Sequence, residues 1–507
     1  MKFSQAVSTA VAVFGFLFTC CSAQLSGTTG PTTTTAQKAA KKICSVLDYG
    51  AKADKSTDLG PSLAAAFAAC KSGGIVWIPS GNYAMSTWQT LNGGSGWAIQ
   101  LDGIIYRTGT AGGHMIIVEN TADFEFFSRT SKGAMQGYGY VFHAQNIYGP
   151  RLIRLVKVNH FSLHDIMLID SPAFHLIVDN CSNGEVYNLL IRGGNRGGLD
   201  GIDTSGTNLW YHDIEVTNKD ECVTIKTPSD HTLVENIYCN WSGGCAMGSL
   251  GSGTAISNVE YNNIYTWQSN QMFMIKSNGG DGYIRDCAFT NFIGHSNAYA
   301  LDIDEYWTSR ALDPGNGVVL SGLTFSNWQG TIIDPKRASI NVVCADGAPC
   351  TGISISNINF WTDTKAPMHY FCRSAYGSGY CLKSGSGGPY QTTTTVSSAP
   401  ANYNGAKMSG DLPAGLGLTV SIAIPAAIPT SFYPGVAALK PLQNGGGAGA
   451  GNGNTGGGAA SLTTATTPVT TAGGGGGTTG SCSALYGQCG GTGYTGATCC
   501  ASGKYDA

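Results

Sequence analysis

This sequence contains little charge and lacks any basic run. Only 12% of its 507 residues are charged, and the formal net charge is −3. Nucleic-acid binding requires a basic patch, so we expect no nucleic-acid partner. Beyond the first 23 residues no apolar run is long enough to span a membrane, so we expect no membrane anchor. The sequence also offers no Cys-x-x-Cys pair or histidine cluster that would suggest a metal site or cofactor.

The N-terminus has the pattern of a secretory signal peptide. Lys2 is followed by a mostly apolar run over residues 7–18 and by small residues before Gln24. Such a segment is removed on export, so we expect residues 1–23 to be cleaved and the protein to be secreted. The next residues, 24–43, are polar and rich in threonine, and we expect them to form a loose arm.

The remaining boundaries follow from composition. Residues 24–440 are long enough for one large domain. Residues 441–480 are dominated by glycine and threonine, which predicts a flexible linker. Residues 481–507 form a separate short segment that contains several cysteines.

Export changes how the 17 cysteines are interpreted. In an oxidising compartment, closely spaced cysteines are expected to form disulfides. The predicted pairs are Cys44–Cys70, Cys222–Cys239, Cys344–Cys350 and Cys372–Cys381. We expect the leftover Cys181, Cys245 and Cys287 to be buried thiols. Two sequons, at Asn180 and Asn240, predict N-glycosylation.

A weak repeat runs through the large domain, where helical periodicity is nearly absent. Short β-rich runs recur, each with a central Asp, Asn or Gly, at positions 165, 188, 213, 236, 263, 286, 322 and 357. A period near 25 residues predicts the coils of a parallel β-helix, with each polar residue at a corner. Propeller blades need about 40 or more residues and fit less well. Residues 61–71 have helical character, and we expect that helix to cover the open end of the strand stack.

Acidic residues are scarce, yet several occur between residues 200 and 221. The four that we single out are Asp200, Asp203, Asp220 and Glu221. Hydrolysis of a glycosidic bond needs one carboxyl group to protonate the leaving oxygen and another to activate water. Aspartates are also common in turns and caps, and for Asp203 that alternative stays open.

Stacking of the predicted coils would bring these acids together. Candidate strands cover 199–203, 220–226, 245–249, 273–277 and 299–304. Neighbouring strands lie about 4.8 Å apart, so Asp200 and Asp220 would face one another on adjacent rungs. Lys276 would lie two rungs beyond Asp220, and Tyr299 three. Strict alternation would send Asp220 and Glu221 to opposite faces, so either a bulge or an entry corner turns both outward, or only one of them is catalytic.

Several segments together resemble the fungal rhamnogalacturonan hydrolases, of the glycoside hydrolase family that includes polygalacturonases. The resemblance covers about residues 24–440 and rests on the segments DYGAKADKSTD, QGYGYVFH, GGLDGID, NKDEC, NWSGGCAMGSLG and MIKSNGG. It implies an all-β fold, a right-handed single-stranded parallel β-helix, and inverting hydrolysis without metal.

The resemblance also implies roles for individual residues. Asp220 matches the proton donor, and Asp200 with Glu221 would activate water. Lys276, Tyr299 and Asp203 would bind substrate. The polygalacturonase Gly-His-Gly is Gly243-Gly244-Cys245 here, so that histidine is missing and His295 is the candidate to replace it. Met274 stands where an arginine is expected.

These losses of positive charge favour a substrate less charged than polygalacturonate. We therefore expect an endo-hydrolase that cleaves galacturonosyl–rhamnose α-1,2 bonds in the pectic polysaccharide rhamnogalacturonan I. The alternatives are a polygalacturonase and a catalytically inactive β-helix that only binds cell-wall glycan. A lyase fits less well.

Residues 481–507 resemble the start of the small fungal cellulose-binding module. The final aromatic residues and part of the cysteine set are absent. Such small modules depend on disulfides, so we expect weak cellulose contact or none. We expect the protein to be a monomer.

Overall fold

The structure is a computed structural model that describes residues 25–333, 336–406 and 414–424. The predicted signal peptide (1–23), linker (441–480) and C-terminal module (481–507) lie outside the described residues. Within the described ranges no helix is long and apolar enough to cross a membrane.

The described residues form short helices and a long series of strands. The helices are α1 (Thr35–Lys41), η1 (Val46–Tyr49), α2 (Gly60–Cys70) and α3 (Tyr140–His143). The strands are β1 (Ile43–Ser45), β2 (Asp54–Asp58), β3 (Ile75–Ile78), β4 (Asn82–Met85), β5 (Gln89–Asn92), β6 (Ser95–Leu101), β7 (Ile104–Arg107), β8 (His114–Glu119), β9 (Ala122–Phe127), β10 (Ala134–Gln136), β11 (Arg151–Val156), β12 (Asn159–His164), β13 (Met167–Ile169), β14 (Leu176–Arg192), β15 (Ile202–Thr217), β16 (Glu221–Asn240), β17 (Gly244–Leu250), β18 (Thr254–Trp267), β19 (Gln271–Ser277), β20 (Gly282–Asn297), β21 (Tyr299–Asp304), β22 (Val319–Ile332), β23 (Ile340–Val343), β24 (Cys350–Thr362), β25 (Met368–Arg373), β26 (Ala375–Ser378) and β27 (Gln391–Val396).

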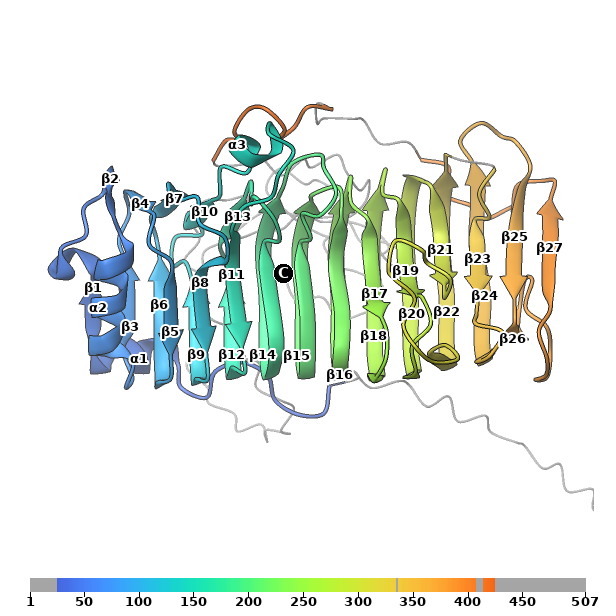
Figure 1. Ribbon diagram of the computed structural model, residues 1–507, viewed down its shortest axis with the longest axis horizontal. Coiled ribbons are helices and arrows are strands. Elements are labelled where there is room, and N and C mark those ends of the chain that lie inside the picture. Colours follow the sequence, from blue (N-terminus) through green and yellow to red (C-terminus); the bar gives the residue numbers. More distant parts are fainter. Residues whose placement is uncertain (1–24, 334–335, 407–413, 425–507) are drawn as a thin grey trace, which may run out of the picture. The chain divides into compact units, whose positions relative to one another are not determined.

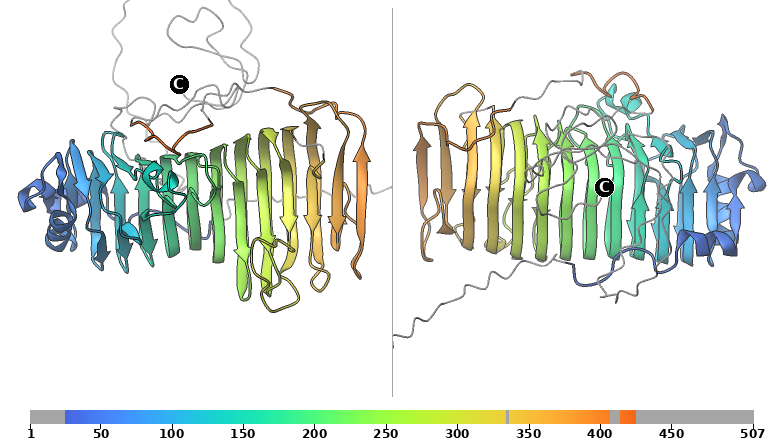
Figure 2. Two further views of the ribbon diagram at one scale, coloured as in Figure 1. Left: turned by 45° about the horizontal axis from the view of Figure 1, so that its top comes forward. Right: turned by 180° about the vertical axis from the view of Figure 1, so that it is seen from behind.

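The strands wind into a right-handed parallel β-helix, as predicted. Each strand pairs in parallel with the strand one coil later, so β14 pairs with β15 and β15 with β16. Figures 1 and 2 show the coils stacked along one axis. The interior is filled by buried Val, Ile, Leu and Phe side chains, because alternate residues of the coil strands point inward.

The two ends of this stack are closed differently. Helix α2 covers the N-terminal end, where it packs on β1, β3 and β5 (Figure 1). At the other end β27 pairs antiparallel with β25 and breaks the parallel series. The predicted helix over residues 61–71 and its capping role are therefore confirmed. At the N-terminal end α2 thus covers an edge that would otherwise expose unpaired backbone groups.

The corners use residues in the left-handed backbone conformation, but the predicted column was partly wrong. Positions 165, 188, 213, 236, 263 and 357 do share one column, and its remaining members are Asn291 and Asn327. Asp286 and Gly322 belong to a second column that continues at Asn258 and Gly352. Both columns carry polar residues at the same period, so the sequence alone did not separate them.

The N-terminal arm is better ordered than predicted. Residues 35–41 form α1, which Thr34 caps through a reciprocal hydrogen-bond pair with Gln37. The buried Lys38 ammonium lies 3.7 Å from Asp123 and 3.5 Å from Glu125. The expectation of a loose arm over 24–43 is therefore wrong, because these contacts bind the described part of the arm to the β-helix.

Cysteines pair as their spacing predicted. The structure contains the disulfides Cys44–Cys70, Cys222–Cys239, Cys344–Cys350 and Cys372–Cys381, and the three remaining cysteines of the described residues, Cys181, Cys245 and Cys287, are buried thiols.

The two sequons have different outcomes. Asn180 is exposed, and its glycosylation stays a prediction. Asn240 is fully buried, and its amide donates to Thr217 at 3.2 Å. A glycan on Asn240 has no room in this fold, so that prediction is wrong.

Candidate active site

The four clustered acids lie at the beginnings of neighbouring strands. Asp200 lies two residues before β15, whose second residue is Asp203, and Asp220 directly precedes β16, which begins at Glu221. The strands β15, β16, β17, β19 and β21 are consecutive parallel neighbours, and we call them the site sheet. The predicted order of rungs is confirmed: Lys276 on β19 lies two rungs from Asp220, and Tyr299 on β21 lies three.

Three of the acids converge. Oxygen atoms from Asp200, Asp220 and Glu221 all lie within 4.8 Å of one another. Asp200 and Glu221 are nearly buried, with 4% and 6% of their surface exposed, whereas Asp220 is half-buried. Asp220 is therefore the member of the trio most open to a bound molecule.

The corner that leads into β16 explains how adjacent residues join one cluster. Asp220 precedes β16, and Lys219 before it adopts a left-handed conformation with φ of 64°. Strict alternation applies within a strand, so it does not separate Asp220 from Glu221. A register shift against β17 follows between Glu221 and Thr224. Of the two devices expected from the sequence, the entry corner is the one located between these residues and the preceding coil.

A buried asparagine joins the two loops that carry the acids. The Asn218 amide donates at 2.8 Å to both Leu199 and Glu221 carbonyl oxygens. Backbone N–H groups of Gly198 and Glu221 donate to the Asp220 carboxylate, which fixes its orientation. Sequence analysis missed Asn218, although it stands at the start of the NKDEC motif.

Two lysines bring positive charge to this cluster. The Lys276 ammonium donates to Glu221, and it also lies 4.6 Å from the centre of the Trp307 ring. Lys226, a second residue that sequence analysis missed, lies 3.3 Å from Asp203. Asp203 thus joins the charge network instead of serving only as a turn residue. Four carboxylates face two ammonium groups, so the cluster favours a bound proton.

Burial decides how these groups titrate. Burial, reinforced by the charges of Asp203 and Asp220, raises the pKa of Asp200 well above its ordinary value. Burial also raises the pKa of Asp203, against the attraction of Lys226. Burial lowers the pKa of Lys276. The cluster therefore holds a proton to higher pH than a solvated carboxyl group would.

The same three acids have donor atoms that suit a divalent cation. The ammonium of Lys276 already contacts Glu221, which places a fixed positive charge beside this donor set. Catalysis without metal stays a prediction.

The contacts of His295 involve groups other than the acid cluster. The residue is 2% exposed, and the groups that act on its charge are Asp363 and the Ala406 backbone. Burial lowers its pKa. Among the hydrogen bonds of the described residues, none joins His295 to Asp200, Asp220 or Glu221. Its predicted catalytic role gains no support from these contacts.

Tyr299 is half-buried on β21, where it pairs in register with Gln271 of β19. The Arg337 guanidinium lies 5.0 Å from the centre of its ring. A role for Tyr299 in substrate binding stays a prediction.

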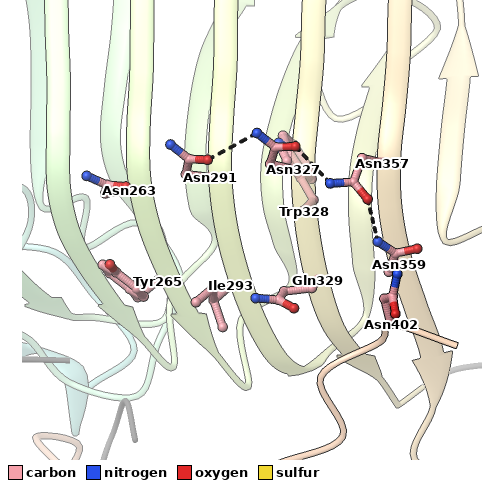
Figure 3. A pocket seen from close by; sticks show the side chains of 10 residues that line it. All are labelled: Asn263, Tyr265, Asn291, Ile293, Asn327, Trp328, Gln329, Asn357, Asn359 and Asn402. Atoms are coloured by element: carbon pink, nitrogen blue, oxygen red, sulfur yellow. Dashed lines mark hydrogen bonds between the residues drawn. The ribbon is translucent and has the colours of Figure 1, made fainter. Parts of the chain in front are cut away.

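A separate pocket of 360 Å³ lies on strands outside the site sheet (Figure 3). Its lining is mostly amide side chains, including the hydrogen-bonded row Asn291, Asn327, Asn357 and Asn359. Among the described residues that line it there is no carboxylate, histidine or lysine, so the pair of carboxyl groups that glycoside hydrolysis needs is not found among them.

Sequence and structure comparisons agree with one another. Residues 78–375 match the family described as glycosyl hydrolases family 28, and residues 485–505 match the fungal cellulose binding domain. The latter match lies outside the described residues.

Two relatives illustrate the sequence similarity. Rhamnogalacturonase A of Aspergillus aculeatus is 60% identical over 417 residues, which is 82% of this chain and 94% of the relative. Probable rhamnogalacturonase B of Aspergillus fumigatus is 59% identical over 440 residues, 86% of this chain and 84% of the relative.

Solved structures with more distant sequences share the fold. Endo-xylogalacturonan hydrolase from Aspergillus tubingensis has a TM-score of 0.58 at 22% identity, covering 68% of this chain and all of the other. An exopolygalacturonase from Thermotoga maritima has the same TM-score at 14% identity, covering 73% of this chain and 96% of its own.

Proposed function

This chain belongs to family 28 of the glycosyl hydrolases, and we propose that it is a secreted endo-hydrolase of rhamnogalacturonan I. The proposed reaction is hydrolysis of galacturonosyl–rhamnose α-1,2 bonds with inversion. The observation that carries the proposal is the convergence of Asp200, Asp220 and Glu221 on adjacent rungs, with Lys276 against Glu221. The substrate is suggested by the rhamnogalacturonase relatives.

The proposed roles follow from exposure and charge. Asp220, the most exposed of the three, is the general acid that protonates the leaving oxygen. Glu221, which pairs with Lys276, and Asp200 together accept a proton from the attacking water. In the free enzyme the raised pKa of Asp200 keeps a proton in the cluster, and a bridging water can pass it to Asp220.

The distance between the carboxyl groups does not by itself identify the stereochemical outcome of hydrolysis. Inverting enzymes usually hold their carboxyl groups about 6.5–9.5 Å apart, and retaining enzymes about 5–5.5 Å. Oxygens within 4.8 Å of one another are closer than the inverting norm. A water that makes two hydrogen bonds of about 2.8 Å can still bridge such a gap.

Digestion of de-acetylated rhamnogalacturonan and of polygalacturonate tests this function. We expect rhamnogalacturonan oligomers with galacturonate at the reducing end and rhamnose at the non-reducing end, and much slower attack on polygalacturonate. Faster attack on polygalacturonate would indicate a polygalacturonase. Unsaturated, ultraviolet-absorbing products would indicate a lyase, and binding without released reducing ends would indicate a glycan-binding protein.

We also propose secretion of a monomer after removal of residues 1–23. Four disulfides in one domain suit an oxidising, extracellular compartment. In this proposal residues 24–440 form the catalytic domain, 441–480 the linker and 481–507 a module with at most weak affinity for cellulose.

A further inference from the structure

The last two strands of the site sheet, β19 and β21, carry side chains of opposite charge. Strand β19 contributes Lys276, whereas β21 contributes Asp302 and Asp304. Lys276 pairs in register with Asp304, and Met274 pairs with Asp302. Residues that pair in register share a face of a parallel sheet, so these side chains lie on the same surface about 4.8 Å apart. This spacing is close to the length of one sugar unit in a polysaccharide.

The surroundings of Asp302 and Asp304 are built for uncharged hydroxyl groups. Asp302 is 6% exposed, and its carboxylate accepts the Asn341 amide of β23 at 2.8 Å. Asp304 is half-buried and accepts the backbone N–H of Tyr306 at 2.9 Å. Both carboxyl groups keep oxygen atoms that can accept hydrogen bonds from sugar hydroxyls.

One cation, Arg337, acts on a carboxyl group of this rung among the contacts of the described residues. Arg337, from the segment that precedes β23, moderates the charge of Asp302 and lies over the Tyr299 ring. Burial raises the pKa of Asp302 to about 6 and also raises that of Asp304. Only the ionised form of a carboxyl group repels a galacturonate carboxylate, so the kinetic comparison below belongs at a pH above about 6.

We propose that Asp302 and Asp304 form a subsite that rejects galacturonate and accepts a neutral sugar, next to a subsite where Lys276 attracts a galacturonate carboxylate. This inference rests on the proposed function. The substrate backbone alternates charged galacturonate with neutral rhamnose, and the site sheet alternates a cation with a pair of acids on adjacent rungs. A polygalacturonate chain laid across the same rungs would place a carboxylate against Asp302 and Asp304. Discrimination then arises from repulsion of the wrong polymer.

Steady-state kinetics of isosteric variants tests the proposal. Asp304→Asn and the double variant Asp302→Asn/Asp304→Asn would be assayed on rhamnogalacturonan and homogalacturonan oligomers of equal length. The ratio of kcat/KM for homogalacturonan to that for rhamnogalacturonan is expected to rise about tenfold in the double variant, as one like-charge contact is relieved. Asp286→Asn is the matched control, because it removes one exposed charge from a corner of β20 away from the site sheet.

The outcomes are distinguishable. A ratio that rises in the site variants and not in the control supports the proposal. An unchanged ratio, in variants that keep the wild-type circular dichroism and remain active on rhamnogalacturonan, overturns it and leaves the proposed function intact. The half-buried Asp304 variant provides this test even if the double variant fails to fold. A wild-type enzyme that prefers homogalacturonan overturns the proposed function and this inference together.

Discussion

At the scale of residues, the central feature is a proton held among crowded carboxylates. Asp200 is the group that burial and like charges push toward the protonated form, whereas Asp220 is the group that faces outward. The proposed mechanism assigns the two residues different tasks, one as the store of the proton and one as its donor. Substitution of each can separate these tasks.

Asp220→Asn should reduce kcat on rhamnogalacturonan about 10²- to 10⁴-fold, because the leaving oxygen is no longer protonated. The same variant should recover much of its activity on an oligosaccharide fluoride, whose leaving group needs no proton. Asp200→Asn should not be rescued in this way. If the fluoride restored the activity of Asp200→Asn and not that of Asp220→Asn, Asp200 would be the general acid and the assigned roles would be reversed.

Asp200→Asn should also change how stability depends on pH. The pKa of Asp200 is higher in the folded state than in the unfolded chain, so its contribution to stability is complete at low pH and is lost as pH rises toward the folded pKa. The Tm difference, variant minus wild type, should therefore become more positive as pH rises from about 4 to 7. A difference that is constant across this range would contradict the raised pKa.

At the scale of elements, the corner columns hold the coils in register. Asn327 adopts a left-handed conformation, with φ of 62°, donates to Asn291 at 3.4 Å and accepts from Asn357 at 2.8 Å. Figure 3 shows this row of amides crossing successive strands. Asparagine tolerates the left-handed conformation, and its amide also links neighbouring coils.

Asn327→Val should lower the free energy of unfolding by about 2–4 kcal/mol, because a β-branched residue is strained there and the amide bonds are lost. Asn327→Gly should cost about 1 kcal/mol, because only the hydrogen bonds are lost. Denaturant unfolding measures both. Equal costs for the two variants would show that backbone conformation does not matter at this corner.

Much of this architecture could be predicted from the sequence, because residues one repeat apart in the sequence of a β-helix lie side by side on adjacent coils. The rung order of Asp200, Asp220, Lys276 and Tyr299 followed directly from the period. The corner columns were confused at positions 286 and 322, because two polar columns share one period. Lys226 and Asn218 were missed because their importance depends on contacts between rungs. Burial of Asn240 could not be read from its sequon.

At the scale of the whole molecule, the described strands and the acid cluster all belong to the β-helix. All described strands lie between residues 43 and 396, and the acid cluster lies near the middle of the stack. The segment 414–424 adds to this body, since the buried Ile422 accepts a hydrogen bond from Gln136 at 2.7 Å. Catalysis should therefore depend on residues 24–440 alone.

A chain ending at residue 440 should keep kcat/KM on soluble rhamnogalacturonan within about twofold of the full chain, since it retains every acid and paired strand. The full chain should be retained on cellulose only weakly, and the shortened chain no more. Tight cellulose binding by the full chain, or loss of activity on shortening, would contradict the proposed division into domains.

The proposed mechanism is tested most directly by proton NMR during digestion of de-acetylated rhamnogalacturonan. Water that attacks from the face opposite the leaving group converts an α bond into a β reducing end. The account predicts that the β anomer of galacturonate appears first and the α anomer only later, through mutarotation. Initial appearance of the α anomer would show retention, and would contradict the roles given to Asp200, Asp220 and Glu221.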